Sequence, residues 1–206
     1  MPNASWLPEG LRKNLHVEHA PSEGAGAFTG GGWKLDWHTT ESNWDSVDAM
    51  RNVLQSKRAA PHFVIGGRAG TKLPVVIQMV GIDQAARALG NFADGFDTNR
   101  ANCIQVEICW RAGASKDLKE WHYKALANLT RLINEALPKE REIPRRLARK
   151  FSNDARFTDA AFVKAEGHLG HKHTPDNDHW DPGPDFRGQF LLNLLCRMPA
   201  GGFDLS

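Results

Sequence analysis

The sequence has few cysteines, no long apolar run and no marked excess of positive or negative charge. Three cysteines among 206 residues are an odd number without metal-type spacing, which argues against a disulfide framework and favours a reduced, cytoplasmic origin. Every apolar run is far shorter than the ~20 residues of a membrane span. A net charge of +2 without a dense basic run argues against nucleic acid as the main partner.

The N-terminus shows no targeting segment either. Residues 1–6 lack the charged and then apolar stretch of a secretory signal, so we expect a protein made in the cytoplasm of its producing cell. The length suits one well-cored domain and leaves little room for a second. No internal repeat or low-complexity linker divides the chain, and we expect a monomer without a membrane partner.

Histidine, aspartate and proline are concentrated in one stretch, residues 170–184, which holds three of each together with two glycines. Proline removes backbone donors and glycine relaxes the chain, so this stretch is a shaped loop rather than a regular helix or central strand. Burying so many ionisable groups without partners would be costly. Zinc binds imidazole and carboxylate ligands, so the composition is compatible with a metal site and equally with a solvated loop.

Residues 33–38 alternate apolar and polar side chains, the pattern of a half-buried strand with His38 on its polar face. Further strands are predicted at 62–66, 73–80 and 103–109. Helical spacing of apolar residues predicts helices at 43–58 and 115–137, and a last helix capped by Asp185. We expect residues 1–32 to be a mostly irregular arm, and residues 151–166 to be an insertion or a short extra helix.

Glu107 lies in the middle of an otherwise apolar strand, on the same face as Gln105. An ionised carboxylate is expensive to bury unless it is paired. Glu107 is therefore either a salt-bridged structural residue or part of a functional site, and the strand pattern alone leaves both interpretations open.

The loop reads Gly-His-x-His-x-Pro-x-Asn-x-His-Trp-Asp-Pro-Gly-Pro, and His38, Gln78 and Glu107 precede it in that order. This pattern resembles the zinc-dependent N-acetylmuramoyl-L-alanine amidases, which share their fold with peptidoglycan recognition proteins and amidase-type phage lysins. The resemblance implies an α/β fold with a central mixed β-sheet flanked by α-helices, and a short helix at 81–89, where several alanines lie. It divides the chain into an N-terminal arm (1–32), a catalytic domain (33–198) and a C-terminal tail (199–206).

The resemblance also implies a set of metal ligands. His38 matches the strand-end histidine of the family, and His171 and Asp181 match the two ligands of the closing loop. Together they would bind Zn²⁺ and leave a fourth position for water. His168 and His173 are alternatives to His171, which we prefer because it precedes Asp181 by ten residues, as in members with an aspartate ligand.

Two further residues receive catalytic roles from the resemblance. Glu107 matches the acidic residue on the strand beside the zinc-bound water, so it is the candidate general base. His179 lies where members carry Lys or His, and we assign it to stabilising the oxyanion of the tetrahedral intermediate.

The implied function is hydrolysis of bacterial peptidoglycan at the amide between N-acetylmuramic acid and the L-alanine of the stem peptide. We expect a phage or prophage endolysin that acts on the cell wall after release. The alternative is a non-catalytic muropeptide-binding module of the same fold, and a weaker one is a zinc hydrolase acting on another amide. Non-catalytic members lack one metal ligand, so the carboxylate of Asp181 favours an enzyme.

Overall fold

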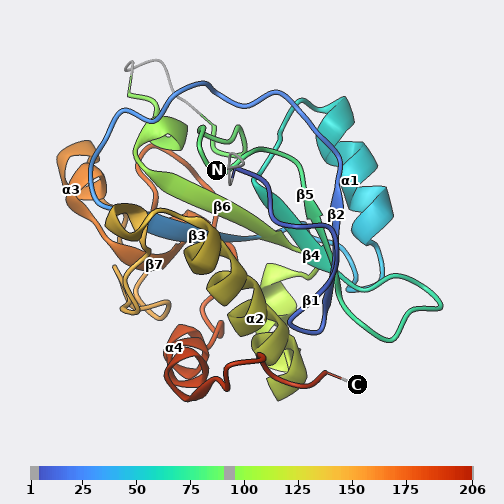
Figure 1. Ribbon diagram of the computed structural model, residues 1–206. Coiled ribbons are helices and arrows are strands. Elements are labelled where there is room, and N and C mark those ends of the chain that lie inside the picture. The colour runs from blue at the N-terminus through green and yellow to red at the C-terminus, as the bar shows by residue number, and fades with distance from the viewer. Residues whose placement is uncertain (1–4, 91–95, 206) are drawn as a thin grey trace.

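Seven strands form one mixed sheet in the computed structural model, which describes residues 5–90 and 96–205 (Figure 1). The order across the sheet is β1-β2-β5-β4-β6-β3-β7. The strands are β1 (Gly10–Arg12), β2 (Leu15–His19), β3 (Lys34–Thr39), β4 (Phe63–Gly66), β5 (Val75–Gln78), β6 (Cys103–Ile108) and β7 (Gly167–Gly170).

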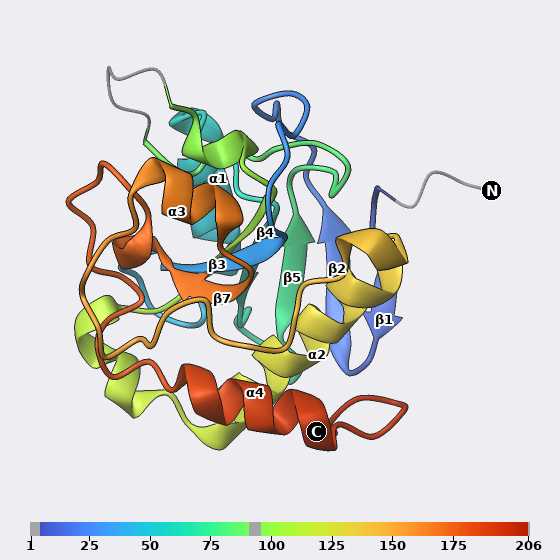
Figure 2. The ribbon, with the colours of Figure 1, turned by 90° about the vertical axis from the view of Figure 1, so that its left-hand side faces the viewer.

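Helices cover both faces of this sheet. They are α1 (Val47–Ser56), α2 (Glu120–Ala136), α3 (Asp159–Lys164) and α4 (Gly188–Arg197). Both ribbon views place α2 and α4 on one face and α1 and α3 on the other (Figures 1 and 2). The predicted fold class, a single α/β domain with a central mixed sheet flanked by helices, is confirmed. Within the described ranges no helix is long and apolar enough to cross a membrane.

The four strands β4, β6, β3 and β7 run parallel to one another, so their carboxyl ends meet at one edge of the sheet. β3 lies between β6 and β7, and all six of its residues are buried. The sequence pattern predicted a half-buried strand, which is wrong because helices cover the sheet on both sides. The face that carries His38 is therefore interior rather than solvated.

The predicted irregular arm is wrong for residues 10–19, which form β1 and β2 at one edge of the sheet. β2 pairs in parallel with β5, and the side chain of Gln78 on β5 accepts a hydrogen bond from the backbone N–H of Leu7 at 2.7 Å. The strands are short, which explains why their pattern did not stand out. Residues 1–4 of the predicted arm and residue 206 of the predicted tail lie outside the described residues.

The helix predicted at residues 81–89 is also wrong, because the backbone there is irregular. Its amides bond to distant groups instead of to the preceding turn: Ala85 pairs with Gly26, and Leu89 donates to the side chain of Asn99. These long-range hydrogen bonds override the helix propensity of the alanines.

The other predicted helices are confirmed, with shifted ends. α2 begins at Glu120 after a short 3₁₀ turn, η2 (Ala112–Asp117), and ends just before Leu137. α3 confirms the short extra helix expected in residues 151–166. The predicted cap of the last helix by Asp185 is wrong, since α4 begins at Gly188 and no side chain caps it.

Candidate metal centre

The strand register sets three of the predicted site residues side by side. His38 on β3 is directly opposite Glu107 on β6. On the other side of β3, Trp37 is opposite Gly170, the last residue of β7, so the next residue, His171, lies beside His38. Parallel strands end at the same edge of a sheet, so Glu107 and His171 become neighbours of His38, although they follow it by 69 and 133 positions in the chain.

Asp181 reaches the same place through the loop that follows β7. Its backbone carbonyl accepts a hydrogen bond from the N–H of Lys172 at 3.0 Å, which closes the loop. Its carboxylate oxygen Oδ2 accepts another from the N–H of Thr39 at 3.0 Å, which ties it to the end of β3. Gly183 has a φ of +92°, and a Cβ there would lie 2.2 Å from the carbonyl oxygen of Ala112, so the loop requires glycine at this position.

The donor atoms of His38, His171 and Asp181 form a compact buried group. The two Nδ1 atoms are 3.1 Å apart, His171 Nδ1 is 3.3 Å from Asp181 Oδ1, and His38 Nδ1 is 3.9 Å from Asp181 Oδ2. Ligands at 2.0–2.2 Å in a tetrahedron are separated by about 3.3–3.6 Å. The cluster therefore has the donor types and the spacing that a tetrahedral zinc ion requires.

The charges of this region also suit a cation. Three buried carboxylates, those of Asp36, Glu107 and Asp181, surround His38, and in the described parts of the chain their ion pairs within 4.0 Å are all with histidines. Burial and the neighbouring imidazole of His171 hold the pKa of His38 well below its usual value, so His38 is neutral and able to coordinate. A bound dication would offset this surplus of negative charge.

Glu107 lies beside the predicted ligands without being one of them. Its Oε1 is 3.9 Å from His38 Nδ1, and its Oε2 is buried with no hydrogen-bond partner in the described residues. Burial, together with the carboxylates of Asp181 and Glu41, raises the pKa of Glu107 well above its usual value. A carboxyl group with a raised pKa is suited to exchanging a proton near neutral pH.

His179 lies at the mouth of the cluster, with its side chain more than half exposed. Its Nδ1 is 3.4 Å from Asp181 Oδ1, and its ring stacks on that of His171 with centroids 4.0 Å apart. The backbone N–H of His179 donates to the side chain of Asn177 at 2.7 Å, which fixes the turn before Asp181. The contact with Asp181 raises the pKa of His179.

The two alternative histidines point elsewhere. His168 Nδ1 accepts a hydrogen bond from the indole N–H of Trp37 at 3.2 Å, on the opposite face of β3 from His38. His173 is held by the N–H of Gly170 at 3.1 Å and by the carbonyl oxygen of Asn153 at 2.8 Å. The structure thus brings together His38, His171, Asp181, Glu107 and His179, and keeps His168 and His173 apart from them.

Asp36 is a member of this region that the sequence reasoning missed. It is fully buried, and its Oδ2 lies 3.5 Å from Nε2 of His38, the ring nitrogen that faces away from the other donors. Histidines that ligate metals commonly donate their second N–H to a carboxylate, which fixes the tautomer and ring orientation. The signal was present in the alternation of β3, which puts residues 36 and 38 on one face.

The fold and this cluster together define an α/β protein with a candidate divalent-metal site at the carboxyl edge of a mixed sheet. No family model matches the sequence. A search of curated proteins found no match either. Among solved structures, the chain is similar to the Staphylococcus aureus hydrolase AmiA, solved in complex with its ligand, with 14% sequence identity and a TM-score of 0.53. The similarity covers 88% of this chain and 80% of AmiA, and at this identity it shows the fold alone.

Proposed function

We propose that this chain is a zinc-dependent hydrolase of bacterial peptidoglycan, which cleaves the amide between N-acetylmuramic acid and the L-alanine of the stem peptide. The main support is the compact donor set of His38, His171 and Asp181 with Glu107 directly across from His38. The loop pattern at 170–184 supports the same reaction, and so does the similarity in fold to a protein described as a hydrolase.

His38, His171 and Asp181 would hold the zinc ion, with Asp36 orienting His38 and the N–H of Thr39 orienting Asp181. When bound, zinc supplies a Lewis acid and lowers the pKa of water in its open position to ~7. The buried surroundings of the donors keep competing water away from them, which strengthens each electrostatic interaction at the site.

Glu107 moves the proton in this reaction. Its carboxylate takes a proton from the attacking water and passes it to the nitrogen of the leaving L-alanine as the carbon–nitrogen bond breaks. The products are the lactyl carboxylate on the sugar and a free α-amino group on the peptide. The raised pKa of Glu107 suits this proton transfer, because it makes the carboxylate a better acceptor of the proton from water, while the carboxyl group so formed can still give that proton to the leaving nitrogen.

His179 is placed to stabilise the charge that develops on the carbonyl oxygen. Its Nδ1 faces the carboxylate of Asp181, which raises the pKa of His179, and the protonated ring also carries a proton on Nε2 that it can donate toward substrate from an exposed position. One such donor aimed at an oxyanion contributes roughly 3 kcal/mol of transition-state stabilisation.

The runner-up function, a non-catalytic muropeptide-binding module, is disfavoured by the complete donor set. A binding module needs neither three converging ligands nor a carboxylate with a raised pKa beside them. The role as a phage or prophage endolysin stays a prediction from the sequence.

Mass spectrometry of purified cell walls after digestion tests the proposal. The expected products are stem peptides with a free N-terminal L-alanine and glycan strands of unchanged length, absent when Glu107→Gln replaces the wild type. Binding to cell walls without new amino termini would favour the binding module. Cleavage of a different amide would favour a zinc hydrolase with another substrate.

A further inference from the structure

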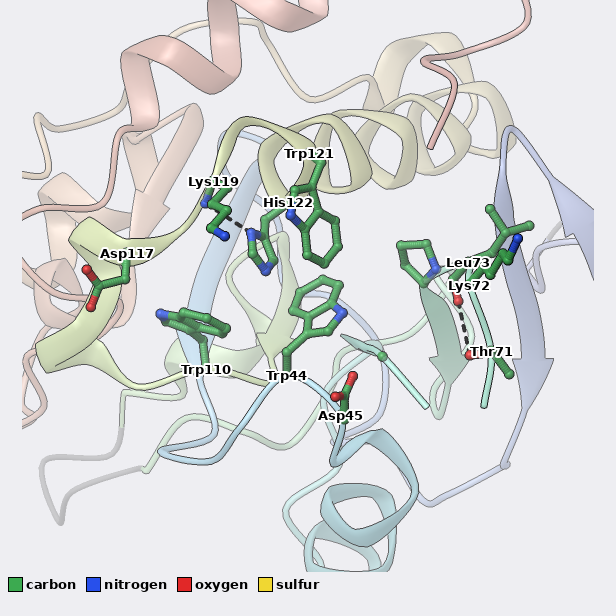
Figure 3. A pocket seen from close by; sticks show the side chains of 12 residues that line it. Trp44, Asp45, Thr71, Lys72, Leu73, Trp110, Asp117, Lys119, Trp121 and His122 are labelled. Carbon is green, nitrogen blue, oxygen red and sulfur yellow. Dashed lines mark hydrogen bonds between the residues drawn. The ribbon is translucent and has the colours of Figure 1, made fainter. Parts of the chain in front are cut away.

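A second concave site lies at the same edge of the sheet as the metal centre. It is a pocket of about 360 Å³, within the range of small-ligand sites, and none of the candidate metal ligands lines it. Its walls come from the connections after β3 and β6, from the connection between β4 and β5, and from the first turn of α2 with the residues just before it. Three of the seven tryptophans of the chain line it: Trp44 after β3, Trp110 after β6 and Trp121 in α2 (Figure 3).

The three indoles gather around one imidazole, that of His122 (Figure 3). The ring centroids of Trp44, Trp110 and Trp121 lie 4.7, 5.0 and 3.6 Å from that of His122. Trp121 is 40% exposed, an unusual position for so large an apolar side chain, and Trp110 is partly exposed. The cluster thus leaves aromatic surface available on the wall of a pocket.

His122 places a single hydrogen-bond donor among these rings. It is only 4% exposed, and its Nδ1 accepts the backbone N–H of Lys119 at 3.0 Å, so Nε2 carries the proton. Nε2 has no hydrogen-bond partner in the described parts of the chain, and Figure 3 shows it pointing between Trp110 and Trp44. Burial lowers the pKa of His122 to about 4, so the ring is neutral at pH 7.

The charged side chains around the pocket balance one another. Asp45 and Asp117 supply two carboxylates, and Lys72 and Lys119 supply two ammonium groups. This balance favours a neutral ligand over an anion or a cation. The carboxylates can accept hydrogen bonds from hydroxyl groups, and the indole faces attract C–H groups through their partial negative charge.

A sugar ring combines these properties. A pyranose presents C–H groups on one face and hydroxyl groups around its rim, and an N-acetyl substituent adds a carbonyl oxygen that would accept the N–H of His122. We propose that this pocket binds an N-acetylated amino sugar of a glycan strand, an inference that rests on the proposed function and assigns the glycan a binding site at the same edge of the sheet as the metal centre.

The pocket and the metal centre share their supporting backbone. Trp110 follows Glu107 by three residues at the end of β6, and Trp44 follows the end of β3. Glu41 connects the segments after β3 and β6, because it accepts hydrogen bonds from the N–H of Ala112 at 2.8 Å and from the hydroxyl of Thr39 at 2.9 Å. A glycan held in the pocket is therefore held by the same segments that end at the candidate catalytic residues.

Titration with the tetramer of N-acetylglucosamine tests the pocket, because this probe carries no stem peptide. Binding to the full-length protein is followed by tryptophan fluorescence and by the indole N–H signals in NMR spectra. We expect saturable binding that weakens about tenfold in Trp121→Ala and is largely retained in Trp121→Phe, which keeps an aromatic face.

Trp180→Ala is the matched control, since Trp180 is 54% exposed but does not line the pocket. It should bind the tetramer with unchanged affinity. Absence of tetramer binding, equal affinity in Trp121→Ala and wild type, or preferential binding of tetramethylammonium would overturn the proposal. Because the probe is not hydrolysed at a stem-peptide amide, failure here is separate from failure of the proposed amidase activity.

Discussion

Glu107 is the residue whose replacement separates chemistry from metal binding. It lies 3.9 Å from His38 Nδ1 without belonging to the donor group. Glu107→Gln preserves the shape of the side chain but removes its ability to accept a proton. Zinc content and fold should be retained, while kcat falls by roughly 10²–10⁴-fold. Turnover near the wild-type rate, measured on purified cell walls, would move the role of general base to another group.

His179 should act in the transition state and not as a ligand, because its ring stacks on His171 at the exposed mouth of the cluster. Removing a donor that acts only on the developing oxyanion lowers kcat and kcat/KM about equally. We expect this pattern in His179→Ala, with partial recovery in His179→Lys, whose ammonium group can also donate. Loss of zinc from His179→Ala would instead make His179 a ligand.

Asp36 should support metal affinity without stabilising the metal-free protein. Its carboxylate is fully buried with no hydrogen-bond partner in the described residues, which is costly without a metal. In Asp36→Asn, zinc affinity measured by chelator competition should fall about 10- to 100-fold. The free energy of unfolding of the metal-free protein should stay equal or rise. Parallel losses of both quantities would show a merely structural role.

His62 joins three segments of the fold. Its Nδ1 accepts the backbone N–H of Gln105 on β6 at 3.0 Å, and its Nε2 donates to the carbonyl oxygen of Gln84 at 2.9 Å. The residue itself immediately precedes β4, so one imidazole connects β4, β6 and the irregular segment at 81–89. These bonds require the neutral ring, and burial lowers the pKa of His62 to about 4.

This pKa predicts a loss of stability in acid. An unfolded histidine has a pKa near 6.5, so between pH 6.5 and pH 4 the unfolded chain binds a proton that the folded chain does not. The free energy of unfolding should therefore decrease as the pH falls through this range, by about 3 kcal/mol from His62 alone. His62→Gln keeps a donor and an acceptor but cannot titrate.

Denaturant unfolding of the metal-free wild type and His62→Gln at pH 7, 5.5 and 4 measures this contribution. The stability advantage of the wild type at pH 7 should shrink steadily toward pH 4. A constant difference between the two proteins across the range would exclude His62 as the titrating group.

The strongly periodic elements could be predicted from sequence, since β3, β6 and α2 follow patterns that local spacing determines. The failures have long-range causes. β1 and β2 are recognisable only through pairing with β5, and the backbone at 81–89 bonds to Gly26 and Asn99 instead of forming a helix. Local propensity does not contain such contacts.

Local sequence patterns predict the site less well than they predict the fold. His38, Glu107, His171 and Asp181 were singled out by a resemblance to known motifs, whereas their proximity depends on the parallel register of β6, β3 and β7. Helices on both sides of the sheet bury the polar face of β3, which the alternation of residues had suggested was solvated. The pocket around His122 is lined by several separate segments between Trp44 and His122, so no single stretch of the sequence predicts it.

The proposed metal site at the carboxyl edge of the sheet connects distant parts of the chain. The three proposed ligands come from β3, from the turn after β7 and from the loop before α4. Binding a metal ion therefore links segments more than 130 positions apart in the chain, as the contact between His38 and His171 already does.

Metal analysis of the purified protein and two ligand variants tests whether His38, His171 and Asp181 form a zinc site. The wild type should carry about one zinc per molecule, and His38→Ala and Asp181→Ala should lose most of it. His168→Gln serves as the control, since His168 is equally buried but contacts Trp37 on the other face of β3, and it should keep its zinc. Full zinc occupancy in both His38→Ala and Asp181→Ala would contradict the proposed metal centre.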